Sequence, residues 1–121
     1  MKKEEVRYET YRSDDADIII VAYGTTARIS ISAIDMAREK GIKAGLIRPI
    51  SLFPFPEEVI NEASSGVEAF LTVEMSLGQM VEDVRLAVNG QCPVHFFGRT
   101  GGIVPSPEEI FERIIEIGGG E

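Results

Sequence analysis

The chain has 121 residues, of which 44% are hydrophobic and 26% are charged, so it has the composition of one small globular domain, and wholesale disorder and fibrous classes are excluded. Its 12 basic and 20 acidic residues give a formal net charge of -8, so we expect it to bind neither nucleic acid nor a membrane surface. The only cysteine, Cys92, excludes an intrachain disulfide, a multi-cysteine zinc site and an iron–sulfur cluster held by this chain alone, and it fits a reducing cytoplasm.

The N-terminal third of the chain predicts two strands and a helix. Residues 6–11 alternate between polar and apolar side chains, as in a half-buried edge strand. After a polar turn at 13–15, residues 17–23 are almost wholly apolar, which indicates a strand covered on both faces. Residues 25–40 then show helical spacing, and Gly41 is a typical residue to follow a helix end.

The middle of the chain repeats this alternation of strand and helix. Residues 43–50 and 68–74 are predicted to form two more interior strands. Between them, Pro56 suits the first turn of a short helix that runs to about Ala63.

The C-terminal third adds a helix, a strand and a last helix. Ser76 and Gln79 match a capping box for a helix that runs to about residue 88. A short strand follows at 94–97, and residues 106–109 (Ser-Pro-Glu-Glu) carry the cap, first-turn proline and capping-box glutamate of the last helix.

This order of elements predicts an α/β fold with helices on both faces of a mostly parallel sheet. The first strand is joined by a short turn and not by a helix, so we expect it to be an antiparallel edge strand. The sequence therefore predicts a three-layer α/β/α sandwich with a mixed sheet of about five strands, in a single domain over residues 1–121 with its core at about 6–117.

Gly24 and Thr25 lie where an interior strand turns into a helix. Free backbone N–H groups at such a turn could bind an anion, although the glycine patterns of dinucleotide and P-loop sites are absent. The alternative is a tight turn in which Thr25 or Thr26 is the N-cap of the helix.

The segment 48–56 (RPISLFPFP) is rich in proline and aromatic residues at the end of a predicted strand. Phe53 and Phe55 are expected to pack either on this domain or on a partner chain. Arg48 could pair with a carboxylate of a neighbouring element, or it could be solvated.

Glu74 ends the third interior strand, a place where α/β enzymes often carry functional groups. The alternative is that Glu74 accepts hydrogen bonds from the next turn or pairs with Arg48. The segment that begins at Glu74 and includes Gln79 contains no histidine or second acid that could form an acid–base pair with Glu74.

The glycine-rich loop 98–106 contains Arg99, which could hold an anion, or the loop could dock against another chain. His95, the only histidine, is expected to be structural, and no Ser-His-Asp or Cys-His arrangement is visible.

Four blocks together make the chain similar to a known family: 21–28 (VAYGTTAR), 45–56 (GLIRPISLFPFP), 73–80 (VEMSLGQM) and 98–102 (GRTGG). Over about residues 6–117 the chain resembles the C-terminal domain of one subunit of 2-oxoacid:ferredoxin oxidoreductases, and most of all their 3-methyl-2-oxobutanoate (2-ketoisovalerate) branch.

The resemblance implies a fold like the C-terminal domain of transketolase, with a five-stranded mixed sheet whose first strand is antiparallel. It also implies a role in oxidative decarboxylation of a branched-chain 2-oxoacid to acyl-CoA with reduction of ferredoxin. Thiamine diphosphate, magnesium and iron–sulfur clusters are expected in the complete enzyme and none in this chain. Its expected partners are the remaining domains and subunits of the oxidoreductase, or a second copy of the chain.

The chain departs from the family subunit in lacking the preceding pyrimidine-binding domain, the Gly-Asp-Gly…Asn motif for diphosphate and magnesium, and cluster cysteines. We therefore expect either a fragment that begins at a domain boundary or a separately encoded domain. The resemblance assigns no catalytic residue here. The expected function is a non-catalytic assembly domain that is inactive alone; the alternative is a free-standing module that binds a small anion at its strand-end loops.

Overall fold

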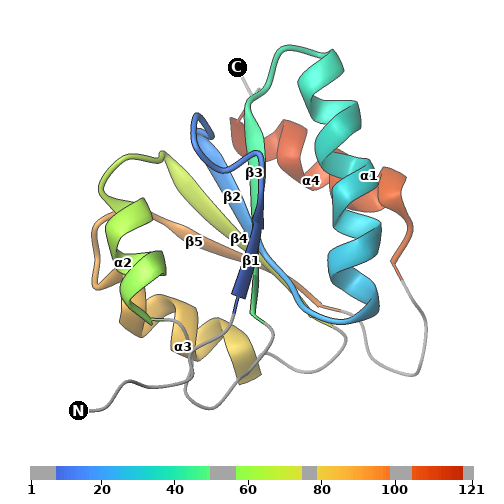
Figure 1. The fold of residues 1–121 in the computed structure, drawn as a ribbon. Coiled ribbons are helices and arrows are strands. Elements are labelled where there is room, and N and C mark those ends of the chain that lie inside the picture. Colours follow the sequence, from blue (N-terminus) through green and yellow to red (C-terminus); the bar gives the residue numbers. More distant parts are fainter. Residues whose placement is uncertain (1–7, 50–56, 75–78, 99–104, 119–121) are drawn as a thin grey trace.

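A mixed sheet of five strands forms the centre of the computed structural model, which describes residues 8–49, 57–74, 79–98 and 105–118 (Figure 1). The strands lie in the order β1-β3-β2-β4-β5. Their bounds are β1 (Tyr8–Tyr11), β2 (Ile18–Val21), β3 (Ala44–Pro49), β4 (Ala69–Glu74) and β5 (Val94–Gly98). β1 pairs antiparallel with β3 and the other neighbours pair in parallel, which confirms the predicted antiparallel edge strand.

Helices cover both faces of this sheet. α1 (Thr25–Glu39) and α4 (Pro107–Gly118) lie on one face, and α2 (Glu57–Ser64) and α3 (Gln79–Val88) lie on the other (Figure 1). The predicted three-layer α/β/α sandwich is therefore confirmed.

The side chains of β2 explain why that strand reads as a continuous apolar run. Ile18 and Ile20 pack into the core under α1 and α4, whereas Ile19 and Val21 pack into the core under α2 and α3. Because successive side chains of a strand point to opposite faces, a strand covered on both sides has no position left for a polar residue.

The turn between β1 and β2 packs against the start of β3. The Arg38 guanidinium donates to the backbone oxygens of Ala44 at 2.9 Å and Arg12 at 2.7 Å, and to the Asp15 carboxylate at 2.8 Å. A Cβ atom on Gly45 would lie 2.6 Å from the oxygen of Arg12, so this close approach requires glycine. The Arg38 hydrogen bond holds the pKa of Asp15 below its usual value of 3.8.

The two helices on the α1/α4 face begin differently, and one prediction was wrong. At α4, Ser106 Oγ accepts the N–H of Glu109 and Glu109 Oε1 accepts the N–H of Ser106, which confirms the capping box. At α1 the N-cap is Gly24 and neither predicted threonine. The Thr26 hydroxyl donates instead to the oxygen of Tyr23 at 2.7 Å. The capping box expected at Ser76 lies outside the described residues.

Candidate functional site

The carboxyl ends of β2, β3, β4 and β5 meet at one edge of the sheet, which we call the carboxyl edge (the lower end of β3 in Figure 1). Because β1 runs antiparallel, its first residue, Tyr8, also lies there and pairs with Pro49 at the end of β3. Open α/β sheets bind their ligands at this edge. Four of the predicted site residues, Gly24, Thr25, Arg48 and Glu74, occupy it in the described chain.

Glu74, the last residue of β4, is buried, with 1% of its surface exposed. Its Oε2 atom accepts the backbone N–H of Val81 at 2.9 Å, in the first turn of α3. A carboxylate is favoured there because the first N–H groups of a helix have no intrahelical acceptor and the helix dipole is positive. Glu74 thus anchors the start of α3 to the end of β4.

Thr72 lies on the same face of β4 as Glu74, two residues earlier. It is fully buried, and its Oγ1 atom has no hydrogen-bond partner. A buried hydroxyl without a partner lowers the stability of the fold. Thr72 differs in this respect from Glu74, whose carboxylate accepts a hydrogen bond. No sequence pattern points to this position, since threonine is a common strand residue.

Arg48 pairs with a carboxylate of a neighbouring element, which is one of the two outcomes expected for it. Its Nη1 atom lies 3.0 Å from Oε1 of Glu9, the residue opposite it in the β1–β3 ladder. Its Nε atom is buried without a hydrogen-bond partner, although the side chain as a whole is 34% exposed. Arg48 therefore joins β3 to β1 at the carboxyl edge, and its Nε atom is enclosed by the domain.

The turn from β2 to α1 is shaped by Gly24, whose φ of 64° lies in the left-handed region that favours glycine. Gly24 and Thr25 are exposed, and no side chain caps the first turn of α1.

The side chains of the other four predicted site residues lie outside the described part of the chain. Phe53, Phe55 and Arg99 lie outside the described residues, and Gln79 begins α3 but its side chain is not described. Their roles therefore stay predictions.

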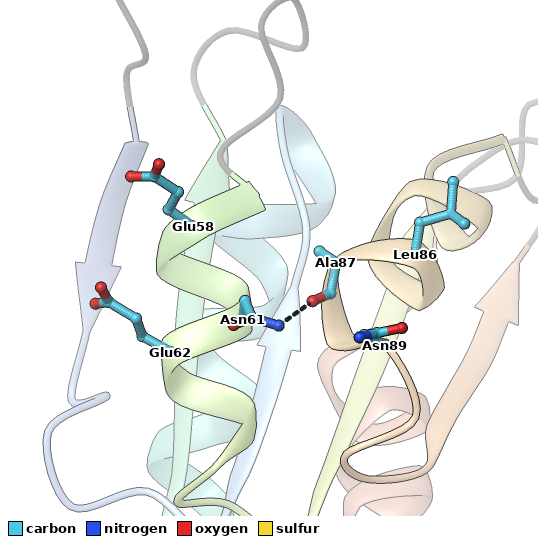
Figure 2. Close-up of a pocket in the computed structure, with 6 residues that line it drawn as sticks. All are labelled: Glu58, Asn61, Glu62, Leu86, Ala87 and Asn89. Carbon is cyan, nitrogen blue, oxygen red and sulfur yellow. Dashed lines mark hydrogen bonds between the residues drawn. The ribbon is translucent and has the colours of Figure 1, made fainter.

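A shallow groove of about 330 Å³ lies between α2 and α3 (Figure 2). Its lining residues are Glu58, Asn61, Glu62, Leu86, Ala87 and Asn89. Asn61 Nδ2 donates to the oxygen of Ala87 at 2.8 Å and so ties the two helices together. Figure 2 shows Glu58 and Glu62 pointing away from α3, so their carboxylates do not converge on a point in the groove.

Other residues that could carry chemistry are dispersed in the described part of the chain. Burial raises the pKa of the Cys92 thiol, which favours its neutral form. Within the described ranges no three His, Cys, Asp or Glu side chains are grouped as they would be around a metal ion. No helix in those ranges is long and apolar enough to span a membrane.

Comparison with known proteins gives a consistent result. Residues 16–110 match the family described as pyruvate:ferredoxin oxidoreductase core domain II. The chain is 48% identical over 119 residues to the ketoisovalerate oxidoreductase subunit VorB of Methanothermobacter marburgensis, a match that covers 98% of this chain and 34% of that subunit. The chain thus spans about a third of the length of this curated relative.

Solved structures share the fold. The 2-oxoglutarate:ferredoxin oxidoreductase from Magnetococcus marinus superposes with a TM-score of 0.79 at 21% identity, over 91% of this chain and 19% of that one. A split-gene transketolase, described as an inactive beta4 tetramer, superposes with a TM-score of 0.78 at 20% identity, over 92% of this chain and 41% of that one. These matches confirm the predicted transketolase C-terminal-like fold.

Proposed function

The chain belongs to the pyruvate:ferredoxin oxidoreductase core domain II family, and on that premise we propose that it is a non-catalytic assembly domain of a 2-oxoacid:ferredoxin oxidoreductase. The observation that carries this proposal is the 48% identity along nearly the whole chain to one third of a ketoisovalerate oxidoreductase subunit. By that relative, the 2-oxoacid is 2-ketoisovalerate, which the complete enzyme would convert to its acyl-CoA while reducing ferredoxin.

The described carboxyl edge supports an architectural role. The Glu74 carboxylate is buried and accepts the N–H of Val81, and Arg48 is paired with Glu9. Both candidate ionisable residues at this edge thus make contacts that hold elements of the domain together: Glu74 joins β4 to α3, and Arg48 joins β3 to β1.

The remaining assignments follow from the same proposal. Residues 1–121 form one domain, and the other parts of the subunit and the other subunits are its partners. Thiamine diphosphate, magnesium and the iron–sulfur clusters are held by those partners, and the assembled enzyme is cytoplasmic.

Binding to the rest of the enzyme tests this function. A ketoisovalerate oxidoreductase would be prepared from which the third of the subunit that matches this chain has been deleted, and the purified chain would be titrated into it in a calorimeter. We expect saturable binding in a 1:1 ratio per deleted subunit.

Two results would contradict the proposal. One is the absence of binding by a chain whose circular dichroism and melting curve show that it is folded. The other is a thermal stabilisation by phosphate or acyl-CoA without any binding to the deleted enzyme, which would favour the free-standing anion-binding module.

A further inference from the structure

The connection from α3 to β5 begins with the only asparagine–glycine pair in the sequence, Asn89 and Gly90. Both residues are exposed, and both have left-handed backbone angles, with φ of 55° at Asn89 and 80° at Gly90. Glycine and asparagine are the residues that most readily adopt this conformation, so they suit the end of a helix. The side-chain amide of Asn89 and the backbone nitrogen of Gly90 can also react with each other, and their surroundings decide whether they do.

The peptide unit that joins Asn89 to Gly90 is not held by the fold. In the described part of the chain, neither the oxygen of Asn89 nor the N–H of Gly90 takes part in a hydrogen bond. The hydrogen bonds on either side are separate: the Asn89 N–H donates to the oxygen of Arg85 at 3.0 Å, and the Gln91 N–H donates to the oxygen of Val88 at 3.2 Å. A coupled rotation about the bonds flanking the 89–90 peptide unit can therefore flip it without breaking either one, because glycine accepts φ of either sign.

The reacting side chain is equally free. Among the described residues the Asn89 carboxamide makes no hydrogen bond, and Figure 2 shows it at the C-terminal end of α3 with no dashed line to its neighbours. A Cβ atom on Gly90 would meet nothing within 4 Å, so the space around this residue is open. The turn thus combines an unhindered amide nitrogen with an unrestrained carboxamide.

We propose that Asn89 deamidates by attack of its own backbone, which makes the Asn89–Gly90 turn a self-modification site. The Gly90 nitrogen bonds to Cγ of Asn89, the bond from Cγ to Nδ2 breaks, and Nδ2 leaves as ammonia with the proton of the Gly90 amide. Water then opens the cyclic imide: cleavage at Cγ gives aspartate, and cleavage at the main-chain carbonyl gives isoaspartate. In sum an amide and a water become a carboxylic acid and ammonia, without oxidation or reduction.

The product changes the groove between α2 and α3. Asn89 lines this groove together with Glu58 and Glu62, so deamidation adds a further carboxylate to its lining. The new charge lies directly after α3, where the negative end of the helix dipole disfavours an anion. The modification therefore places charge where the fold opposes it.

Asn61, the other asparagine of the sequence, is an internal control. It lies within α2, its Nδ2 atom donates to the oxygen of Ala87 at 2.8 Å, and Glu62 and not a glycine follows it. Trypsin cuts after Arg85 and so places the two asparagines in separate peptides. The chain, shown by circular dichroism to be folded, would be incubated at mildly alkaline pH, and both peptides would be followed by mass spectrometry while released ammonia is measured.

We expect the Asn89 peptide to convert to the acid at least about tenfold faster than the Asn61 peptide, because only Asn89 has an unhindered intramolecular nucleophile. Both aspartate and isoaspartate should form. Asn89→Gly, which suits the left-handed turn and lacks the carboxamide, should lose most of the ammonia release.

Two results would overturn the proposal. One is an Asn89 that stays intact in the folded chain, whether or not it converts in urea, because the fold would then lock the turn. The other is aspartate without isoaspartate, because direct hydrolysis of the side chain forms aspartate alone. Neither result bears on the assembly function.

Discussion

At the scale of single residues, β4 buries two polar side chains, of which Glu74 accepts a hydrogen bond and the Thr72 hydroxyl has no partner. Glu74 was a candidate from its place at a strand end, and the alternative that it accepts a backbone hydrogen bond from the residues that follow is confirmed by the N–H of Val81. Thr72 gave no signal at all, because the lack of a partner for its hydroxyl depends on everything packed around it. By contrast, the Ser106–Glu109 capping box was predictable because both partners lie within one helical turn.

The unpaired hydroxyl of Thr72 makes a testable prediction about stability. Valine has nearly the same shape and no hydroxyl, so Thr72→Val should raise the free energy of unfolding by about 1 kcal/mol. Urea unfolding followed by circular dichroism measures the change.

Thr10→Val is the control, because Thr10 is exposed on the edge strand β1 and its hydroxyl can reach water. We expect that substitution to leave stability nearly unchanged. A loss of stability in Thr72→Val would show that the hydroxyl has a partner in solution.

At the scale of elements, the order and type of the helices and strands were predictable and one helix start was not. The alternation of apolar strands with amphipathic helices and the short connection after β1 are enough to give a mixed sheet covered on both faces. The cap of α1 was wrong because the chain turns at Gly24 in a left-handed conformation, which makes the glycine itself the N-cap. A threonine hydroxyl that donates back to a preceding carbonyl, as Thr26 does to Tyr23, cannot be told from a cap by sequence alone.

The hydrogen bonds of Arg38, which join α1 to the β1–β2 turn and the start of β3, give a prediction at this scale. Arg38→Met removes hydrogen bonds to two backbone oxygens and to Asp15, and we expect it to lower the free energy of unfolding at neutral pH by about 1–3 kcal/mol. Arg85→Met is the control, because the ion pair of Arg85 with Glu82 is long, at 3.9 Å, and exposed.

The hydrogen bond between Arg38 and Asp15 also predicts that the free energy of unfolding depends on pH. The pKa of Asp15 in the folded chain lies below its usual value of 3.8, because Arg38 hydrogen-bonds the charged carboxylate. The stabilisation is therefore fully present above that usual value and is lost as the pH falls through the lowered folded pKa. Unfolding free energies measured from neutral to acidic pH should converge for wild type and Asp15→Asn. Parallel curves would show that the pair does not contribute.

At the scale of the whole molecule, the predicted site residues Gly24, Thr25, Arg48 and Glu74 gather at the carboxyl edge of the sheet. The two ionisable side chains among them, Arg48 and Glu74, both make contacts within the fold. The family resemblance and the fold were both predictable from sequence blocks that lie along the strands and their ends. The partner of Arg48 was not predictable, because the Arg48–Glu9 pair depends on β1 lying beside β3, a pairing between residues about 40 positions apart.

The most direct test of the assembly role is turnover. Ferredoxin reduction would be followed with 2-ketoisovalerate and coenzyme A, using the chain alone, the enzyme deleted of the matching third of its subunit, and the two mixed. We predict no reduction by the chain alone, little by the deleted enzyme, and recovery that rises with added chain until one copy is bound per deleted subunit. Ferredoxin reduction by the purified chain alone, or binding of thiamine diphosphate to it without any partner, would contradict this account.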